Sequence, residues 1–447
     1  MRKILIAYSG MLLLMLATAC SSAQKVQHAA RVQVFVQNQV VPLMKGLDRN
    51  SLMRVRVYVP KGQQLTARSL QLQLDKEAMA AVERLELVVR DDNQRSLWEN
   101  ARVVATITPS SSLLNLPIDT DLKPGLHTWW VSALLKPGAD IDKKISLRAV
   151  SLTGSNEKVY SVTNSSDQPG EAPVFTRRLG VAVRKAWDDS VHTYRIPGIA
   201  TTDKGTLIAV YDIRYKHSGD LPANIDVGMS RSTDGGRTWE PMRNIMDMGV
   251  PHENNGVGDP AVLFDPATRK IWVAALWSKG NRSIAGSQPG LSPDTTGQFV
   301  LASSGDDGLT WSAPYSITSQ IKNPAWHLYF NGPGTGTVMK NGTLVFASQY
   351  WDESRKPGVP HSSIIYSDNG GKTWKSGTGA KYNTTESQVV ETVPGTLMLN
   401  MRDNRGRFRS VATTSDMGKT WIEHPTSYEA LVDPVCQASL IRAAIPL

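Results

Sequence analysis

An eight-residue pattern, Ser/Thr-x-Asp/Asn-x-Gly-x-Thr-Trp, occurs four times in this chain of 447 residues. The copies span residues 232–239, 304–311, 367–374 and 414–421. Recurrence of one motif indicates an internal repeat, in which each structural unit carries the same local feature. All four copies lie in the second half of the chain, so the repeat constrains the fold of that half.

Each octet has the chemistry of a tight hairpin turn. An Asp or Asn side chain bonds backbone amides two residues farther on, and Gly adopts a positive φ without a steric penalty. The closing Trp is expected to pack under the turn while its indole N–H finds a partner. Short alternating strands surround the octets, at residues 207–213, 271–277, 299–303, 344–350 and 364–366. Repeated units of a few short strands with a fixed turn predict a β-propeller.

The four octets, preceded by Tyr-Arg-Ile-Pro at residues 194–197, resemble the sialidase (neuraminidase) family and its Asp-boxes, or BNR repeats. The resemblance covers roughly residues 178–447 and implies a six-bladed propeller that hydrolyses terminal α-linked sialic acid with retention. In the family, a third arginine and the nucleophilic tyrosine follow a Cys-Gln-x-Ser segment, here residues 436–439. No tyrosine follows Tyr428. The propeller is therefore expected to be incomplete at the C-terminus, with weak or no turnover by the chain as written.

The fold class expected for the whole chain is all-β, with two domains. Residues 27–162 carry alternating apolar runs separated by Pro- and Gly-containing breakers, which is typical of a β-sandwich. Related bacterial sialidases often carry such a module, so an accessory scaffold or carbohydrate-binding role is expected. Residues 163–173 are polar and contain Pro and Gly, which predicts a linker. The propeller is then expected over residues 174–447.

Residues 1–20 have the pattern of an export signal, with Arg2 and Lys3 ahead of an apolar run and small residues before Cys20. Cys20 resembles the acylated cysteine of a bacterial lipoprotein, and plain cleavage nearby is the alternative. The expected location is the periplasm, outer membrane or cell surface of a bacterium, with membrane attachment only through this lipid. The net charge of +9 is scattered, which argues against a nucleic-acid partner.

The expected substrate determines which residues the site needs. Sialic acid carries a carboxylate at its anomeric carbon, so a carboxylate nucleophile would meet another negative charge, and sialidases use tyrosine instead. Arginine suits that carboxylate because its planar fork matches the geometry. By resemblance, Arg195 and Arg402 are two members of the family's arginine triad, the alternative for Arg195 being a surface ion pair. Arg405 and Arg407 lie in the same loop as Arg402 and are its rivals. Ile-Pro after Arg195 is expected to hold the chain extended.

Two carboxyl groups are assigned to catalysis by the same resemblance. Asp220, in a Gly-containing loop, matches the acid/base aspartate, and Asp226 is the nearest rival. Glu386 matches the glutamate that takes the proton from the tyrosine. Glu391 is the alternative and is expected to face solvent or a neighbouring strand.

Two further residues resemble parts of the substrate pocket. Arg214 matches an arginine that supports the substrate or the acid/base aspartate, and a strand-end arginine facing solvent is the alternative. Asp259 matches an aspartate that lines the sialic acid pocket, and a turn-capping role is the alternative.

No metal or cofactor is expected, because the eight His residues show no pair at ligand spacing. Cys436 lies in an apolar context and is expected to be a buried small hydrophobe. The predicted function is an exo-α-sialidase acting on sialylated glycoproteins, glycolipids and oligosaccharides. The alternatives are an inactive sialic-acid-binding or scaffold remnant and, more weakly, an Asp-box glycosidase for another sugar.

Overall fold

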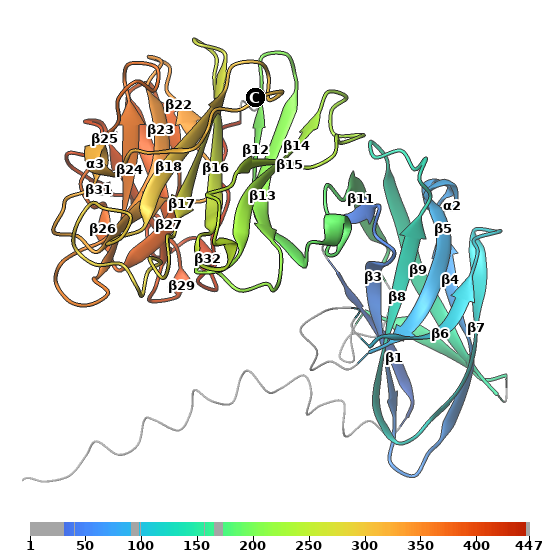
Figure 1. Ribbon diagram of the computed structural model, residues 1–447. Coiled ribbons are helices and arrows are strands. Elements are labelled where there is room, and N and C mark those ends of the chain that lie inside the picture. The colour runs from blue at the N-terminus through green and yellow to red at the C-terminus, as the bar shows by residue number, and fades with distance from the viewer. Residues whose placement is uncertain are drawn as a thin grey trace, which may run out of the picture. The chain divides into compact units, whose positions relative to one another are not determined.

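The computed structural model of the chain describes residues 31–39, 41–90, 98, 100–155, 157–164 and 173–443. The predicted export signal, with Cys20, and residues 165–172 of the predicted linker lie outside this part. Within it the chain is built of strands, as predicted, and has two short α-helices, α2 (Lys76–Ala81) and α3 (Thr318–Ile321). Two short 3₁₀ helices, η1 (Asp188–Ser190) and η2 (His252–Asn254), are also present. The chain divides into two compact units, residues 1–182 and 183–447 (Figure 1).

The first unit is a β-sandwich. One layer consists of β6 (Arg102–Ile107), β5 (Val82–Val89), β8 (Gly125–Leu135), β3 (Asn50–Val59) and β1 (Gln33–Asn38). The other layer contains β7 (Leu113–Leu122), β4 (Leu65–Leu74), β9 (Lys144–Gly154), β10 (Val159–Thr163), β11 (Phe175–Val181) and β2 (Leu43–Lys45). Alternate side chains of both layers point inward. They form one buried cluster, to which β3 contributes Val57, β4 Leu72 and β9 Leu147.

The boundary between the units differs from the predicted one. The propeller was expected from residue 174, but β11 pairs antiparallel with β9, with Phe175 opposite Leu147. It also pairs parallel with β2. Phe175 and Leu179 are buried in the sandwich core. Strand β11 therefore belongs to the first unit, because its apolar face completes that core, and the second unit begins at Val183.

The second unit consists of four blade-like sheets and a short ribbon. The first sheet contains β12 (Thr193–Thr201), β13 (Leu207–Arg214), β14 (Ile225–Ser232) and β15 (Arg243–Met246). The second contains β16 (Val257–Asp265), β17 (Lys270–Trp277), β18 (Gln298–Ser304), β19 (Tyr315–Ser316) and β21 (Gly334–Thr335). The third contains β20 (Leu328–Asn331), β22 (Thr337–Val338), β23 (Leu344–Trp351), β24 (Pro360–Ser367), β25 (Lys375–Ser376) and β26 (Lys381–Tyr382). The fourth contains β27 (Thr384–Val393), β28 (Thr396–Asp403), β30 (Ser410–Thr414) and β31 (Ile422–Glu423), and the ribbon pairs β29 (Arg407–Phe408) with β32 (Val432–Asp433).

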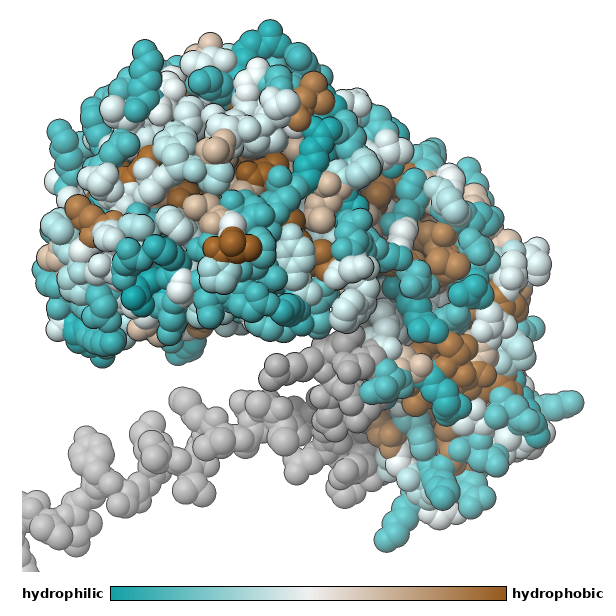
Figure 2. Space-filling model, in the orientation of Figure 1, coloured by the Kyte–Doolittle hydropathy of each residue, from teal (hydrophilic) through white to brown (hydrophobic). Residues whose placement is uncertain are grey.

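Each octet forms the hairpin that precedes the short outer strand of its blade, β15, β19, β25 or β31. This repeat of one hairpin in four sheets fits the expected incomplete propeller. On the face shown in Figure 2, hydrophilic side chains predominate and apolar ones occur in patches. Most of the apolar side chains in the described ranges are buried in the cores. Helices of the length and apolarity needed to cross a bilayer are absent from the described ranges.

The octet turn has the predicted local chemistry. Asp306 accepts the Thr310 backbone N–H at 2.8 Å and the Thr310 hydroxyl at 2.5 Å. These bonds hold the pKa of Asp306 at about 2. Gly308 has a φ of 84°, as expected. The indole of Trp311 donates to the Gly308 carbonyl at 3.3 Å.

The expectation for the indole group is wrong at the third octet. The Trp374 side chain is buried, and its Nε1 has no partner among the described residues. Its ring instead packs edge-on against Trp272, with the ring centroids 6.0 Å apart. Apolar packing therefore outweighs the hydrogen bond at this octet.

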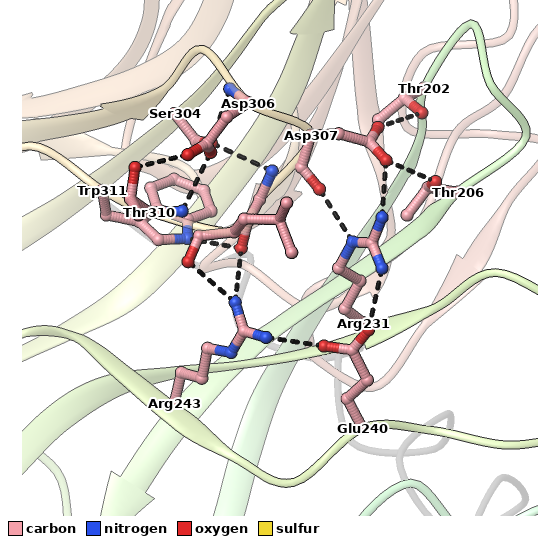
Figure 3. A network of polar contacts seen from close by, with 12 residues as sticks. Thr202, Thr206, Arg231, Glu240, Arg243, Ser304, Asp306, Asp307, Thr310 and Trp311 are labelled. Carbon is pink, nitrogen blue, oxygen red and sulfur yellow. Dashed lines mark hydrogen bonds and ion pairs between the residues drawn. The ribbon is translucent and has the colours of Figure 1, made fainter.

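Asp307, inside the second octet, joins two blades (Figure 3). Its carboxylate accepts the hydroxyls of Thr202 at 2.8 Å and Thr206 at 2.7 Å, both in the β12–β13 turn. It also accepts Nη2 of Arg231, on β14, at 2.7 Å. Arg231 is bonded in turn to Glu240 at 2.7 Å. Burial favours the neutral form of Asp307, but the three hydrogen bonds outweigh it and lower the pKa.

We expect Asp307→Asn to lower the melting temperature of the second unit by about 3–8 °C at neutral pH. The estimate assumes a loss of about 1–3 kcal/mol when a buried charged hydrogen-bond network is weakened. Because the folded-state pKa is depressed, this stabilisation is present above the ordinary Asp pKa and disappears as pH falls through the folded value. Asparagine also tolerates the φ of 67° at this position.

The measurement is thermal unfolding of both proteins between pH 7 and pH 3. Asp368→Asn, which changes a surface carboxylate paired with Lys375, is the control and is expected to leave the melting temperature unchanged. A difference that stayed constant down to pH 3 would show that the charge of Asp307 is not the cause.

Candidate active site

The predicted site residues come from the same end of three blade sheets. Arg195 lies near the start of β12 and Arg214 at the end of β13, and these strands pair so that Arg195 faces Asp212. Asp259 lies near the start of β16, and Glu386 lies near the start of β27. Arg402 lies near the end of β28, which pairs with β27. The structure thus gathers side chains that are up to 207 residues apart in the chain (402 minus 195).

The backbone at Arg195 is not extended as predicted. Ile196 has a φ of 56°, and the pairing register shifts between Arg195 and Gly198. This β-bulge places a β-branched residue in the left-handed region, where it is strained. Strain of this kind is concentrated at functional sites, where it directs a side chain. Here, Nη1 of Arg195 donates to the Ser218 carbonyl at 3.0 Å and to Asp220 Oδ1 at 3.2 Å.

Arg214 is buried beneath the loop that carries Asp220. Its side chain is about 2% exposed, and Nη1 donates to Asp220 Oδ1 at 2.6 Å. The same Nη1 donates to the carbonyls of Ser218 at 2.8 Å and Gly219 at 2.9 Å. Of the predicted alternatives, the geometry favours support of the aspartate, since a side chain this buried neither faces solvent nor reaches a substrate.

Asp212 is a site residue that the sequence reasoning missed. Its Oδ2 accepts Nε of Arg214 at 3.0 Å and Nη2 at 2.8 Å. Burial raises the pKa of Asp212 to about 6, against the opposing effect of Arg214. The sequence contains one signal for this pair. Asp212 and Arg214 are two residues apart at the end of an otherwise apolar strand, so both side chains lie on the same face of the sheet.

Asp259 adjoins this pair and has an unusual backbone. Its N–H donates to Asp212 Oδ1 at 2.8 Å, and its φ is 57°. Its carbonyl accepts Asn331 Nδ2 at 2.6 Å. Burial, followed by repulsion from Asp212 and Glu386, raises the pKa of Asp259 well above its ordinary value. Of the two carboxyl groups, Asp212 has Arg214 as a direct ion-pair partner. Asp259 therefore keeps its proton more readily than Asp212 does.

Glu386 and Arg402 form a second ion pair, with Arg402 Nη1 donating to Glu386 Oε2 at 2.7 Å. The rival arginines have other partners. Arg405 pairs with Asp403 at 2.6 Å, and its guanidinium lies 3.9 Å from the ring centroid of Tyr428. The guanidinium of Arg407 lies 5.9 Å from the ring centroid of Phe408. Arg402 is the arginine of this loop that the structure brings to Glu386.

The rival carboxyl groups have structural roles. Asp226 is buried and accepts the Tyr215 hydroxyl at 2.9 Å and Asn244 Nδ2 at 2.7 Å. Glu391 is also buried and accepts the backbone N–H groups of Lys340 and Gly395, each at 2.8 Å. Lys340 lies in the β22–β23 turn and Gly395 in the β27–β28 turn, so Glu391 contacts two turns and not solvent or a neighbouring strand, as had been expected.

A cavity of about 340 Å³ lies beside Arg195. It is lined by Arg195, Ile196, Pro197, Pro333, Gly334 and residues 437–439. Gln437 is held over it by a bond from Nε2 to the Pro333 carbonyl at 2.7 Å. Arg409, which is buried, fixes the same segment by donating to the Cys436 carbonyl at 2.6 Å. The Cys436 side chain is exposed, so its predicted burial is wrong: the fold uses its backbone and not its thiol.

In the part of the chain that the structure describes, no three His, Cys, Asp or Glu side chains lie together as a metal site requires. The predicted site residues and Asp212 form four arginine–carboxylate contacts: Arg195–Asp220, Arg214–Asp220, Arg214–Asp212 and Arg402–Glu386. Guanidinium groups in such an arrangement can bind an anion, and carboxyl groups can transfer protons.

Comparison with known proteins identifies the family. Residues 196–445 match the BNR repeat-like domain family, and residues 31–158 match the N-terminal domain of BNR-repeat neuraminidase. The chain belongs to the BNR-repeat neuraminidase family. A sialidase of Bacteroides fragilis (strain YCH46) is 47% identical over 342 residues, which are 75% of this chain and 61% of the relative. A sialidase of Micromonospora viridifaciens is 31% identical over 320 residues, which are 70% of this chain and 47% of the relative.

A solved sialidase structure has a similar fold. Hadza microbial sialidase Hz136 is 37% identical, with a TM-score of 0.79, and the match covers 90% of this chain and 82% of that one. This chain spans 61% and 47% of the lengths of the two bacterial sialidases above. Membership of the BNR-repeat neuraminidase family is therefore shown over both units.

Proposed function

We propose that this chain carries the substrate-binding and acid/base groups of an exo-α-sialidase that removes terminal sialic acid from glycoproteins, glycolipids and oligosaccharides with retention. One observation carries the proposal. Two expected carboxylate-binding arginines each contact an expected catalytic carboxyl: Arg195 with Asp220 at 3.2 Å, and Arg402 with Glu386 at 2.7 Å. A scaffold protein requires neither pair.

The two arginines would bind the carboxylate of the substrate. A guanidinium is always charged and presents its donors in a fixed fork, which suits a carboxylate better than the ammonium of lysine does. The side chains of Arg195 and Arg402 are 43% and 33% exposed, so both reach the solvent-facing side of the site. Arg214, which is buried, would instead hold Asp220 in place.

Asp220 would act as the general acid. Its side chain is 78% exposed on the loop above Arg214, and Arg195 and Arg214 share its Oδ1. In this position Asp220 gives its proton to the glycosidic oxygen as the bond to the leaving sugar breaks, and later takes one from the attacking water. The leaving sugar would therefore lie on the Asp220 side of the site.

Glu386 would act as the base for the nucleophile. A free phenol is mostly protonated at neutral pH and needs a base to become nucleophilic. The family uses tyrosine for this step. A sialic-acid-binding protein that does not hydrolyse its ligand is the second candidate function.

The experiment measures binding and release separately. We expect calorimetry with this chain to detect binding of free sialic acid. We expect the product of the whole gene to release sialic acid from sialyllactose, with the α-anomer appearing first by NMR. Binding without release would support the second candidate, whereas neither binding nor release would overturn both.

Arg195→Ala is expected to weaken the binding of sialic acid by about 10²-fold, because a charge-assisted bidentate contact is worth about 1.5–3 kcal/mol. Arg407→Ala is the control, since that side chain is exposed and lies over Phe408. If both variants bound with the affinity of the parent chain, Arg195 would not be a carboxylate clamp.

We also propose that the protein is exported and anchored through a lipid on Cys20. The support is the sequence pattern before Cys20 alone. Cys20→Ser should move the protein from the membrane fraction to the soluble fraction of the cell. Equal amounts of parent and variant in the membrane fraction would contradict the anchor.

A further inference from the structure

We propose that Asp212 is a positioning residue of the acid/base site, which holds both the arginine under Asp220 and the backbone of Asp259. The inference rests on the proposed function and assigns a role to a residue outside the expected catalytic set. Asp212 is 1% exposed, so it does not touch a substrate. Its two oxygens have separate partners, and each partner leads to a different part of the site.

The first oxygen orients Arg214. Oδ2 accepts both Nε and Nη2, which fixes the plane of the guanidinium and leaves Nη1 directed at Asp220. Asp212 is the buried one of the two carboxylates that Arg214 contacts, so without it the buried guanidinium would be compensated only by the exposed Asp220. Nη1 in turn holds the carbonyls of Ser218 and Gly219, and thereby the loop that ends in Asp220.

The second oxygen holds the strained peptide of Asp259. Oδ1 accepts the Asp259 N–H at 2.8 Å, and the residue is kept at a φ of 57°. Gly258 leaves the space for this contact, because a Cβ there would lie 3.0 Å from Asp212 Oδ1. One carboxylate therefore couples β13 of the first blade to β16 of the second, and it does so directly below the catalytic loop.

The charge of Asp212 also balances that of Arg214. The charged groups around this loop are Arg195 on β12, Asp212 and Arg214 on β13, Asp259 on β16 and Glu386 on β27. With Asp212 present, Arg214 is balanced by a buried carboxylate. Without that negative charge, the exposed Asp220 would be the one carboxylate in contact with this buried guanidinium, and the contact that fixes the guanidinium plane would be weaker.

The test uses Asp212→Asn, which keeps the shape of the side chain and removes its charge. Asp226→Asn is the matched control, because Asp226 is also buried in this blade and bonds Tyr215 and Asn244 instead of Arg214. In this chain, we expect hydrogen exchange of residues 216–221 and 257–260 to rise by about 10-fold in Asp212→Asn only. Unchanged exchange in both segments would overturn the coupling.

The second measurement compares kcat/KM for sialyllactose with kcat/KM for an aryl sialoside that has an acidic phenol, in the active gene product. We expect Asp212→Asn to lose more activity on sialyllactose than on the aryl sialoside, because a displaced Asp220 protonates the poor leaving group less well. A merely structural role would lower the amount of folded enzyme and leave the ratio between the substrates unchanged. An unchanged ratio would overturn the positioning of Asp220, and leave the proposed function standing because the parent enzyme is active.

Gly258→Ala is a second variant for the case that Asp212→Asn does not fold. It keeps all charges and presses a methyl group against the Asp212 carboxylate. We expect faster exchange in both segments, as in Asp212→Asn, by a smaller factor. Faster exchange at 257–260 alone would show that the Asp259 contact is not coupled to the Asp220 loop.

Discussion

Asp220→Ala is expected to reduce kcat/KM for a natural sialoside by about 10²- to 10⁴-fold, but by less than about 10-fold for an aryl sialoside with an acidic phenol. The difference arises because a sugar alcohol is a poor leaving group and needs the proton as the bond breaks. An acidic phenol leaves without it. The measurement compares the two substrates in the active gene product at one pH.

Two further variants test whether the difference between the two substrates comes from the general acid Asp220. Arg195→Ala should lower kcat/KM for both substrates by similar factors, because its contact with the carboxylate does not depend on the leaving group. Asp226→Asn should leave the ratio between the substrates unchanged, since that carboxyl bonds Tyr215 and Asn244. If Asp220→Ala affected both substrates equally, Asp220 would not be the general acid.

Glu386→Gln is expected to lower kcat for both substrates by about 10²- to 10⁴-fold, since the base acts on the nucleophile and not on the leaving group. Glutamine still accepts the bond from Arg402 Nη1, so the affinity for sialic acid should change by less than about 10-fold. Kinetics with both substrates and calorimetry with sialic acid measure these quantities.

The control for this variant is Glu391→Gln, on the same strand. Glu391 is buried and holds the backbone at Lys340 and Gly395, so its change should lower stability and leave the rate per folded molecule near that of the parent. A loss in Glu386→Gln that was confined to the natural sialoside would assign Glu386 to leaving-group protonation and contradict its role as base.

Local chemistry accounts for what the sequence predicted well. The octet turn depends on residues at most four positions apart, as in the bonds from Ser304 and Thr310 to Asp306. Positive φ at Gly308 follows from the same short segment. The all-β class and the repeat of blades follow from four such turns. Among the residues that the family motif named, the structure brings Arg195 to Asp220 and Arg402 to Glu386.

Non-local pairing decided the rest. The strand Phe175–Val181 has a pattern that would suit either unit, and only its pairing with Lys144–Gly154 assigns it to the sandwich. The same holds at the site, where Ile196 is left-handed because the two strands pair out of register at that point.

The sequence by itself determined the fold class and the repeat, because short motifs and local turns encode them. Only the tertiary structure decided that Asp212 joins Arg214 to the Asp259 peptide, that Glu391 is buried, and that Cys436 is exposed. These outcomes depend on which segments meet across blades. A contact between residues 47 positions apart, such as Asp212 and Asp259, has no local pattern that predicts it.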